Sequence, residues 1–434
     1  MEVRDPVHGS IPVFDEEIPI IQHKFFQRLR AIKQLGFSEY AFPGATHTRF
    51  LHSIGVMSVG TKAFDKLFEG KHGNPEVLRL RETLRLSCLL HDIGHAPLSH
   101  STETVMPNLS ELKLSSRFLS DKDKAEDRQA THEDYTIKSI ADSSFSESFK
   151  LVEKKFGVDK NAIADLVVGR TTDEGYFTVN GVNYFPLLHQ LVSSEMDCDR
   201  MDYLLRDSYF CGVSYGQYDL DWLIDNLSAC VIDNKAYIGI SERAIATFDD
   251  FLLSRFHMFI MVYFHYRAVC LEQVLYRYFQ TSNEYKIPAD IEKYQEHDDQ
   301  FLMKVLKNSD NQWAKKIVAN EIPRKIFETF GEEQEPKLNE IIKYCESDNI
   351  DYILCSSLGR ISKYYTTDDS PNVEYPMQMV RNFYGQAAPE FFPIDQATVI
   401  FQKFSHAHSV KRMHIDMESL PQEKREKVLK LVSR

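Results

Sequence analysis

One short segment combines histidine and aspartate in a way that could bind a metal: His91-Asp92-Ile93-Gly94-His95-Ala96-Pro97-Leu98-Ser99-His100. Apolar residues before it recur at helical spacing, and His91 continues that stripe toward the protein interior. Gly94 and Pro97 end the helix, so His91 and Asp92 fall in its last turn, where carbonyl ends favour a cation. A buried imidazole beside a buried carboxylate is costly unless a partner satisfies both. A divalent metal would do so, although a buried histidine hydrogen-bonded to aspartate is the common alternative.

Two other predicted helices carry side chains that could complete a metal site. A helix over about residues 48–68 places His52 on its buried face. A helix over about residues 187–208 places Asp199 on one face with Tyr203, and with Arg206 and Asp207 further along. The spacing does not prove that these faces meet, and Asp197 or Asp202 could serve in place of Asp199. Nitrogen and oxygen ligands of this kind suit Fe, Mn, Zn or Co, with positions left for water.

The composition of the chain excludes several classes of protein. The chain has 434 residues and is 43% hydrophobic, which is enough for two lobes, and its net charge of −13 argues against coating nucleic acid non-specifically. The seven cysteines are scattered singly without a Cys-x-x-Cys pair, so a disulfide framework or zinc ribbon is unexpected and a reducing cytoplasm is expected. The N-terminus has no signal-peptide pattern, and the apolar stretch 251–266 contains charged residues, which indicates a buried helix and no membrane span.

Local patterns predict the elements around the site. Residues 1–20 indicate an extended arm or small hairpin. Residues 23–33 indicate a helix whose basic side, with Arg28 and Arg30, is expected to face solvent. Asn-Gly at 180–181 and Asp-Asn at 233–234 predict hairpins. One long helix is expected over residues 244–279, and the polar sequence after it predicts a lobe boundary, giving a core over residues 1–280 and a C-terminal lobe over 281–434.

Several ordered motifs resemble one family. They are the segments Asp5-Pro6-Val7-His8-Gly9, residues 26–36, residues 42–53, the His91-Asp92 pair, and residues 197–207. Together they resemble the HD-domain deoxynucleoside triphosphate triphosphohydrolases, which include bacterial dGTPase-like enzymes and the catalytic core of the vertebrate antiviral dNTPase. The resemblance covers about residues 1–280. It implies a mainly α fold with an HD-domain helical core and small β-hairpins, followed by a smaller mixed α/β lobe.

The resemblance also implies roles for the matching positions. The metal ligands would be His52, His91, Asp92 and Asp199. The groups around the α-phosphate would be His95, His100 and His132, with Glu133 and Glu103 orienting them. The triphosphate would be held by Arg49, Arg200 and Arg255. The sugar would be framed by Gln34, Leu35, Tyr203, Asp207 and Tyr263, with Asp207 accepting from the 3′-OH and Leu35 and Tyr263 excluding a 2′-OH.

The implied reaction is attack of metal-activated water on the α-phosphorus of a dNTP, releasing deoxynucleoside and intact triphosphate, with Mg bound to the substrate. Gln27 and Arg30 match part of the guanine-reading motif of an allosteric site. That motif's acidic member falls at Gln22, and a neutral amide cannot accept paired guanine N–H donors as a carboxylate does. This argues against dGTP as the activator and leaves another nucleotide effector open. The resemblance further implies a cytoplasmic homo-oligomer, a tetramer or hexamer, without membrane association.

Simpler readings exist for single residues. Arg49 could be a surface ion-pair residue, and Tyr263 could be an ordinary core aromatic. His406, His408 and His414 suggest a metal site by spacing, but a polar loop is the preferred interpretation.

Two other functions compete with the dNTPase hypothesis. Another HD phosphohydrolase, such as a 5′-nucleotidase or cyclic-nucleotide phosphodiesterase, would need the metal ligands but not Arg49, Tyr203, Asp207 and Tyr263. A weakly catalytic HD module that binds nucleic acid or a partner is the second alternative. The acidic charge balance and the full ligand set argue against it.

Overall fold

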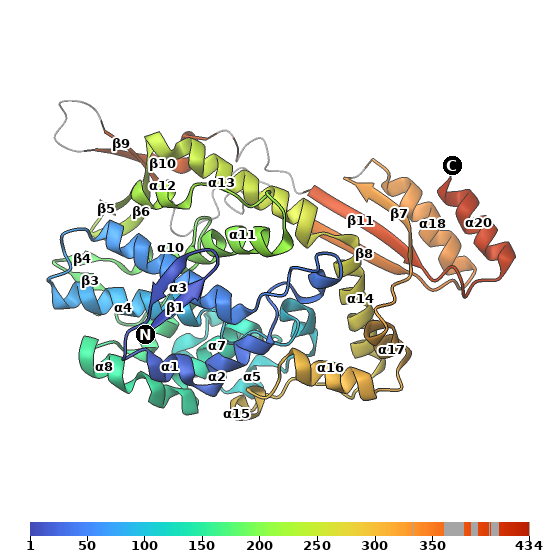
Figure 1. The fold of residues 1–434 in the computed structure, drawn as a ribbon, viewed down its shortest axis with the longest axis horizontal. Helices are drawn as coiled ribbons and strands as arrows, with labels where there is room; N and C mark the ends of the chain where they lie inside the picture. The colour runs from blue at the N-terminus through green and yellow to red at the C-terminus, as the bar shows by residue number, and fades with distance from the viewer. Residues whose placement is uncertain (332, 360–376, 383–388, 399, 401–407, 434) are drawn as a thin grey trace.

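Helices form most of the structure, a computed structural model that describes residues 1–331, 333–359, 377–382, 389–398, 400 and 408–433 (Figure 1). The longer helices are α3 (Arg49–Leu67), α4 (Pro75–Leu90), α7 (His132–Ala141), α9 (Lys160–Val168), α10 (Phe185–Val192), α11 (Cys198–Cys211), α13 (Ile245–Met258), α14 (Tyr266–Thr281), α16 (Asp299–Asn308), α18 (Glu335–Ser347) and α20 (Gln422–Val432). The shorter helices are α1 (Ile18–Gln22), α2 (Lys24–Gln27), α5 (Leu109–Leu112), α6 (Asp121–Ala125), α8 (Lys150–Phe156), α12 (Leu220–Asp225), α15 (Ile291–Tyr294) and α17 (Gln312–Val318). Short 3-10 helices cover Arg28–Ala31, Gly36–Tyr40, Ser99–Val105, Ser116–Phe118, Ser144–Phe149, Glu242–Ala244 and Ile394–Gln396, and a π-helical turn covers Phe259–Tyr263.

The strands form three small sheets among the described residues. They are β1 (Glu2–Asp5), β2 (Gly9–Pro12), β3 (Thr178–Val179), β4 (Val182–Asn183), β5 (Leu227–Ile232), β6 (Lys235–Ser241), β7 (Arg324–Phe330), β8 (Ile353–Gly359), β9 (Gln378–Arg381), β10 (Glu390–Pro393) and β11 (His408–Ile415). β1 and β2 pair as an antiparallel hairpin, β10-β9-β6-β4-β3 form one sheet with β5 added beside β6, and β7-β11-β8 form an antiparallel sheet. The hairpins predicted at the N-terminus, at 180–181 and at 233–234 are confirmed.

Two large apolar cores and one small one hold these elements together. The first includes Phe26 and Leu90, and the second includes Val59 and Met201. The small third core gathers side chains of α18, β11 and α20. Figure 1 shows the sheet β7-β11-β8 with α18 and α20 at one end of the molecule, beyond α14. The mainly α fold with a mixed C-terminal region is confirmed. The boundary at residue 280 stays a prediction, and side chains of residues 285–317 pack into the first core.

The helices that carry the candidate ligands begin and end as their sequences require. α3 starts after Thr48, and α4 starts at Pro75 after Asn74, whose side chain accepts a hydrogen bond from the Glu76 amide. α4 ends at Leu90, which leaves His91 at its C-terminal cap. α3 packs on both α4 and α11, so the three helices bring their facing side chains together.

Three predicted helices are interrupted. The helix expected over residues 187–208 breaks between α10 and α11, because Asp197 caps α11 by accepting from the Arg200 amide. The helix expected over 244–279 is divided by the π-helical turn, after which the His265 side chain caps α14. The helix expected over 23–33 ends at Gln27 and continues as a 3-10 turn. Among the described residues, every helix is too short or too polar to cross a membrane.

Candidate metal and phosphate site

Three side chains from α3, the end of α4 and α11 meet in the interior. His52, His91 and Asp199 each direct one ligand atom into a space where these atoms lie within 4.8 Å of one another. Asp199 Oδ1 lies 2.9 Å from Nε2 of His52 and 3.6 Å from Nε2 of His91. The faces predicted to converge therefore do converge around these three residues.

The two imidazoles are oriented by their other ring nitrogens. His52 Nδ1 bonds to a carboxylate oxygen of Asp202 at 2.8 Å, and His91 Nδ1 donates to the carbonyl of Cys88 at 2.8 Å. Both Nε2 atoms are buried, and in the described part of the chain neither makes a hydrogen bond of acceptable geometry, although the Asp199 carboxylate lies close to both. A buried nitrogen without a well-formed hydrogen bond is costly, and an imidazole whose Nδ1 is fixed by a second group is the usual form of a metal ligand. The residues present therefore fit a divalent cation.

Asp92 lies beside this group. Its Oδ2 is 3.6 Å from His52 Nε2 and its Oδ1 is 3.3 Å from His91 Nε2. Arg49 donates to Oδ2 and also, through Nε, to the hydroxyl of Ser99 at 2.9 Å. Burial opposes ionisation of Asp92, but Arg49 and the His91 and His95 imidazoles outweigh it and hold the pKa of Asp92 well below its usual range. Arg49 is only 5% exposed, so it is not a surface ion-pair residue.

The groups that orient His52 were not predicted from the sequence. Asp202, considered there as an alternative ligand, instead orients His52, while its Oδ1 lies 2.6 Å from His8 Nε2. Arg206 donates to both oxygens of Asp202 at 2.8 Å and to Asp5 at 2.8 Å. The Asp5-Pro6-Val7-His8-Gly9 motif was the sequence signal for this network, because the Asp5 and His8 side chains both belong to it.

A second supporting group was wrongly expected to face solvent. Arg28 is 5% exposed, and its Nη2 donates to the carbonyls of Ile93 and His95 at 2.9 and 2.7 Å. Its Nη1 donates to the carbonyl of His297 at 2.7 Å. The guanidinium thereby fixes the turn after His91-Asp92, where helix geometry has ended and carbonyls need donors. A helical wheel cannot reveal this role, because the acceptors are backbone atoms of a distant segment.

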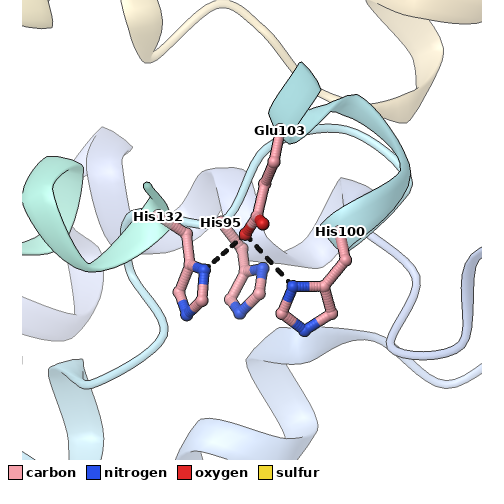
Figure 2. A group of neighbouring side chains, drawn as sticks. All are labelled: His95, His100, Glu103 and His132. Carbon is pink, nitrogen blue, oxygen red and sulfur yellow. Dashed lines mark hydrogen bonds and ion pairs between the residues drawn. The ribbon is translucent and has the colours of Figure 1, made fainter. Parts of the chain in front are cut away.

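A cluster of imidazoles lies next to the metal candidate. Figure 2 shows the carboxylate of Glu103 directed toward His95, His100 and His132, with hydrogen bonds to the last two. The distances from Glu103 Oε1 are 2.5 Å to His132 Nδ1 and 3.1 Å to His100 Nδ1. His95 stacks on His132 with ring centroids 3.9 Å apart. With both Nδ1 atoms on Glu103, Nε2 of His100 and His132 can contact a substrate.

The charges in this cluster are set by burial and neighbours. Burial opposes ionisation of Glu103, but its hydrogen bonds with His100 and His132 lower its pKa to about 2. Burial, with Arg49 and His132 nearby, holds the pKa of His95 well below its usual value, so this ring is neutral at pH 7. Glu133 differs from its expected role. It is exposed, and within the described chain the hydrogen bonds that orient His100 and His132 come from Glu103.

A cavity of about 380 Å³ opens onto both groups. The predicted site residues that line it are Gln34, Arg49, His91, Asp92, His95, His100, His132, Glu133, Asp199, Arg200 and Tyr203. Small-molecule sites usually have volumes of roughly 300–1,000 Å³, so the cavity can hold a small ligand. Gln34 Oε1 is buried without a hydrogen-bond partner in the described structure, which leaves one acceptor for such a ligand.

The remaining predicted sugar residues, Leu35, Asp207 and Tyr263, lie outside this lining. The Tyr263 hydroxyl donates to Asp207 at 2.7 Å, and His47 Nε2 lies 2.8 Å from the other oxygen of Asp207. Tyr263 also meets Tyr203 edge to face, with ring centroids 6.2 Å apart. Leu35 packs on the second core. His47 was unassigned in the sequence, and only the fold shows that it holds Asp207.

Two predicted triphosphate residues converge on one carboxylate. Arg255 Nη1 donates to Glu195 at 3.1 Å, and Arg200 Nη1 lies 3.7 Å from the same oxygen. Arg200 lines the cavity, whereas Arg255 lies outside its lining. The two guanidiniums therefore sit side by side, with one facing the cavity.

The predicted effector residues form their own surface pair. Arg30 Nε donates to Gln27 at 2.8 Å, and its guanidinium lies over the Phe50 ring, 3.6 Å from the centroid. Gln27 donates in turn to the carbonyl of Ile21. Both residues lie outside the lining of the cavity described above: Gln27 is the last residue of α2, and Arg30 lies in the 3-10 turn that follows it.

Comparisons with known proteins give the family context. A family model described as the HD domain matches residues 49–204. The uncharacterized protein YwfO of Bacillus subtilis is 32% identical over 287 residues, which is 65% of this chain and 56% of that protein. The deoxynucleoside triphosphate triphosphohydrolase SAMHD1 of Gallus gallus is 27% identical over 393 residues, 85% of this chain and 61% of that protein. The chain thus spans less than two thirds of the length of these relatives.

A solved structure shows the same fold. The crystal structure of a hypothetical protein from Aquifex aeolicus superimposes with a TM-score of 0.72 at 23% identity. The match covers 100% of this chain and 99% of that chain.

Proposed function

We propose that this chain, whose residues 49–204 match the HD domain, is a metal-dependent phosphohydrolase that cleaves deoxynucleoside triphosphates to deoxynucleoside and inorganic triphosphate. The proposal rests on two buried imidazole nitrogens, of His52 and His91, that make no hydrogen bond of acceptable geometry in the described chain and lie beside a cavity lined by Arg49 and Arg200. Cation ligands next to guanidiniums suit a polyanionic substrate. The similarity to proteins named as dNTP triphosphohydrolases supports the choice of substrate.

The metal ligands would be His52, His91, Asp92 and Asp199. If these residues held a divalent cation, Fe, Mn, Zn or Co, it would lower the pKa of bound water toward neutrality and so supply a hydroxide nucleophile. Arg49 and Arg200 would bind phosphate oxygens together with Mg brought by the substrate.

The imidazole cluster would act on the α-phosphate. His100 and His132, each fixed through Nδ1 by Glu103, would present Nε2–H groups to phosphate oxygens or to the departing 5′-oxygen. The neutral His95 would hydrogen-bond without adding charge. Because Glu103 is ionised well below pH 7, it holds both rings in one orientation throughout the physiological range.

Gln34 and Tyr203 would contact the sugar from the cavity lining. Asp207 would accept from the 3′-OH, since a carboxylate that already accepts from His47 and Tyr263 keeps further lone pairs. Leu35 and Tyr263 would exclude a 2′-OH. Arg255 would support Arg200 through their shared contact with Glu195.

Product analysis tests this reaction. The purified protein is incubated with each of the four dNTPs, alone and in mixtures, with Mn²⁺ or Mg²⁺, and products are separated by anion-exchange chromatography. We expect deoxynucleoside and triphosphate in equal amounts. Orthophosphate or a nucleoside monophosphate would contradict the proposal and favour another HD phosphohydrolase. Binding of single-stranded DNA without turnover of any dNTP would favour a nucleic-acid-binding module.

Matched variants tie the activity to the site. Asp199→Ala should abolish turnover and lower metal content while the circular dichroism spectrum is kept. Asp221→Ala, an exposed position on α12, should leave both unchanged. Retention of full activity by Asp199→Ala would remove the metal assignment.

Regulation and assembly are part of the same proposal. The pair formed by Gln27 and Arg30 would belong to an effector site for a nucleotide, and the protein would assemble as a tetramer or hexamer. Light scattering with and without each dNTP measures the oligomeric state. An unchanged monomer under all conditions would contradict this part alone.

A further inference from the structure

A second cluster of side chains that could bind a metal comes from later segments of the chain. Unlike the residues at the cavity, it includes sulfur ligands. Cys270 of α14, Cys355 of β8 and His414 of β11 each offer one ligand atom, and these atoms lie within 4.8 Å of one another. Their exposed fractions are 0%, 1% and 0%. A polar loop was expected for His406, His408 and His414. For His414 this expectation is wrong, because strand β11 lies between β7 and β8 and its His414 side chain is buried, whereas His406 lies outside the residues that the structure describes.

His414 is oriented in the same way as His52 and His91, the two imidazoles of the first candidate metal site, called here the HD site (His52, His91, Asp92 and Asp199). His414 Nδ1 donates to the carbonyl of Pro323 at 3.0 Å, which leaves the lone pair on Nε2. Nε2 is buried and has no hydrogen-bond partner in the described residues. The fold therefore aims an unpartnered imidazole nitrogen at two thiols.

The donor set selects a type of metal. Two thiolates and one imidazole are typical of zinc sites, with Zn–S near 2.3 Å and Zn–N near 2.0–2.1 Å. Tetrahedral geometry with these bond lengths separates ligand atoms by roughly 3.6–3.8 Å. Small side-chain rotations would bring the present atoms to that spacing. Two thiolates also neutralise a divalent cation, which lowers the cost of burying it.

We propose that Cys270, Cys355 and His414 form a second metal site, selective for Zn²⁺ or a similar soft divalent cation, with a water molecule as the fourth ligand. Its ligands come from α14 on one side and from the β7-β11-β8 sheet on the other. The cation would therefore cross-link this sheet to α14. α14 begins three residues after Tyr263, and Arg412 of β11 donates to the carbonyl of Phe264 at 2.5 Å, so β11 also contacts the residue that follows Tyr263.

Co²⁺ is the probe that separates this site from the HD site. Thiolate ligands give cobalt a sulfur-to-metal charge-transfer absorption in the near ultraviolet, whereas the nitrogen and oxygen ligands of the HD site cannot. The metal-free, fully reduced protein is titrated with Co²⁺ and then with Zn²⁺. We expect the charge-transfer band to appear with Co²⁺, to disappear when Zn²⁺ displaces it, and total metal content to reach two equivalents per chain.

Variants at the three proposed ligands test whether the charge-transfer band comes from this site. Cys355→Ser, Cys270→Ser and His414→Gln should each lose or strongly weaken the band and lower the metal content by one equivalent, while keeping the HD-site metal. Cys345→Ser, at an equally buried cysteine of α18, should keep the band. Asp199→Ala should lose one equivalent and keep the band, so failure of the HD-site proposal is distinguishable from failure of this one.

Two results would overturn the proposal. One is the absence of the band in wild-type protein whose seven thiols titrate as free. The other is a band that persists in both Cys355→Ser and Cys270→Ser. A disulfide between these two cysteines in protein purified without reductant, combined with no band after reduction, would identify the cluster as a thiol pair and count against a metal site.

Discussion

Asp202 lies directly against His52: its Oδ2 is 2.8 Å from the imidazole Nδ1, and neither side chain is exposed to solvent. This contact directs Nε2 of His52 toward Asp199 and His91. The candidate ligand is therefore held by a carboxylate that is itself fixed by His8 and Arg206.

Asp202→Asn should weaken metal binding about 10–100-fold, because a neutral amide orients the imidazole less firmly and lowers its basicity. Equilibrium dialysis with Mn²⁺ measures the change. Asp221→Asn, at an exposed aspartate, is the control. Unchanged affinity in Asp202→Asn would show that His52 does not depend on this carboxylate.

Metal binding should release protons. Burial opposes protonation of His52, but Asp199 and Asp202 raise its pKa to about 9, and Asp92 and Asp199 likewise raise the pKa of His91 to about 10. Both rings must be neutral to bind a cation, so binding at pH 7 should release about two protons and tighten as pH rises. Calorimetry of Mn²⁺ binding in buffers with different ionisation enthalpies counts the protons.

The same shifts predict the stability of the metal-free protein. A histidine whose folded pKa is raised above 6.5 stabilises the fold fully below that pH, and the contribution is lost as pH rises through the folded value. The free energy of unfolding of the metal-free protein should therefore fall between pH 7 and about 10, the folded pKa of His91. Urea unfolding of metal-free and metal-loaded protein tests this. A parallel fall in both forms would contradict it.

Gly55→Ala should destabilise the protein, although alanine normally stabilises a helix interior by about 0.5–1 kcal/mol over glycine. A Cβ at Gly55 would lie 2.0 Å from Asp202 Oδ1 and 2.2 Å from Arg206 Nη2. Overpacking of this kind costs about 1–3 kcal/mol. The free energy of unfolding measured with urea and the metal content should both fall. A more stable variant would show that α3 and α11 separate easily.

Arg28→Lys should lower the free energy of unfolding by about 1–3 kcal/mol, because a lysine cannot bridge the carbonyls of Ile93, His95 and His297 at once. Chemical unfolding measures the loss. Arg30→Lys, at an exposed arginine two residues away, should change stability by less than about 0.5 kcal/mol. Equal effects at both positions would argue against a specific role for Arg28.

Tyr263→Phe should lower kcat/KM for dNTPs about tenfold, since Asp207 would lose a charge-assisted hydrogen bond of 2.7 Å while the ring is kept. Steady-state kinetics with a dNTP and its ribonucleotide test this. Discrimination against the ribonucleotide should persist in Tyr263→Phe and decrease in Leu35→Ala. No change in either variant would place the sugar elsewhere.

Elements with local sequence signals could be predicted before the structure was known. The spacing of apolar residues fixed α3 and α4, and it directed His52 and His91 inward, because a helix with one apolar face must bury that face. Turn residues fixed the hairpins, since positive φ angles at Asp233 and Asn234 suit the short turn between β5 and β6. The family resemblance then supplied roles for these residues that spacing alone did not.

Tertiary structure decided which distant groups meet. Arg28 was expected in solvent and is buried, because its acceptors are carbonyls that no helical pattern encodes. Asp202 and Asp199 lie three residues apart on α11, and only the packing of α3 decides that one orients His52 and the other faces the ligand space. Cys270, Cys355 and His414 are far apart along the chain, and a sequence without paired cysteines gave no sign of a sulfur site. Local patterns contain the spacing of apolar residues along each helix or strand. A site depends on the relative positions of several elements, and these positions are set by long-range packing.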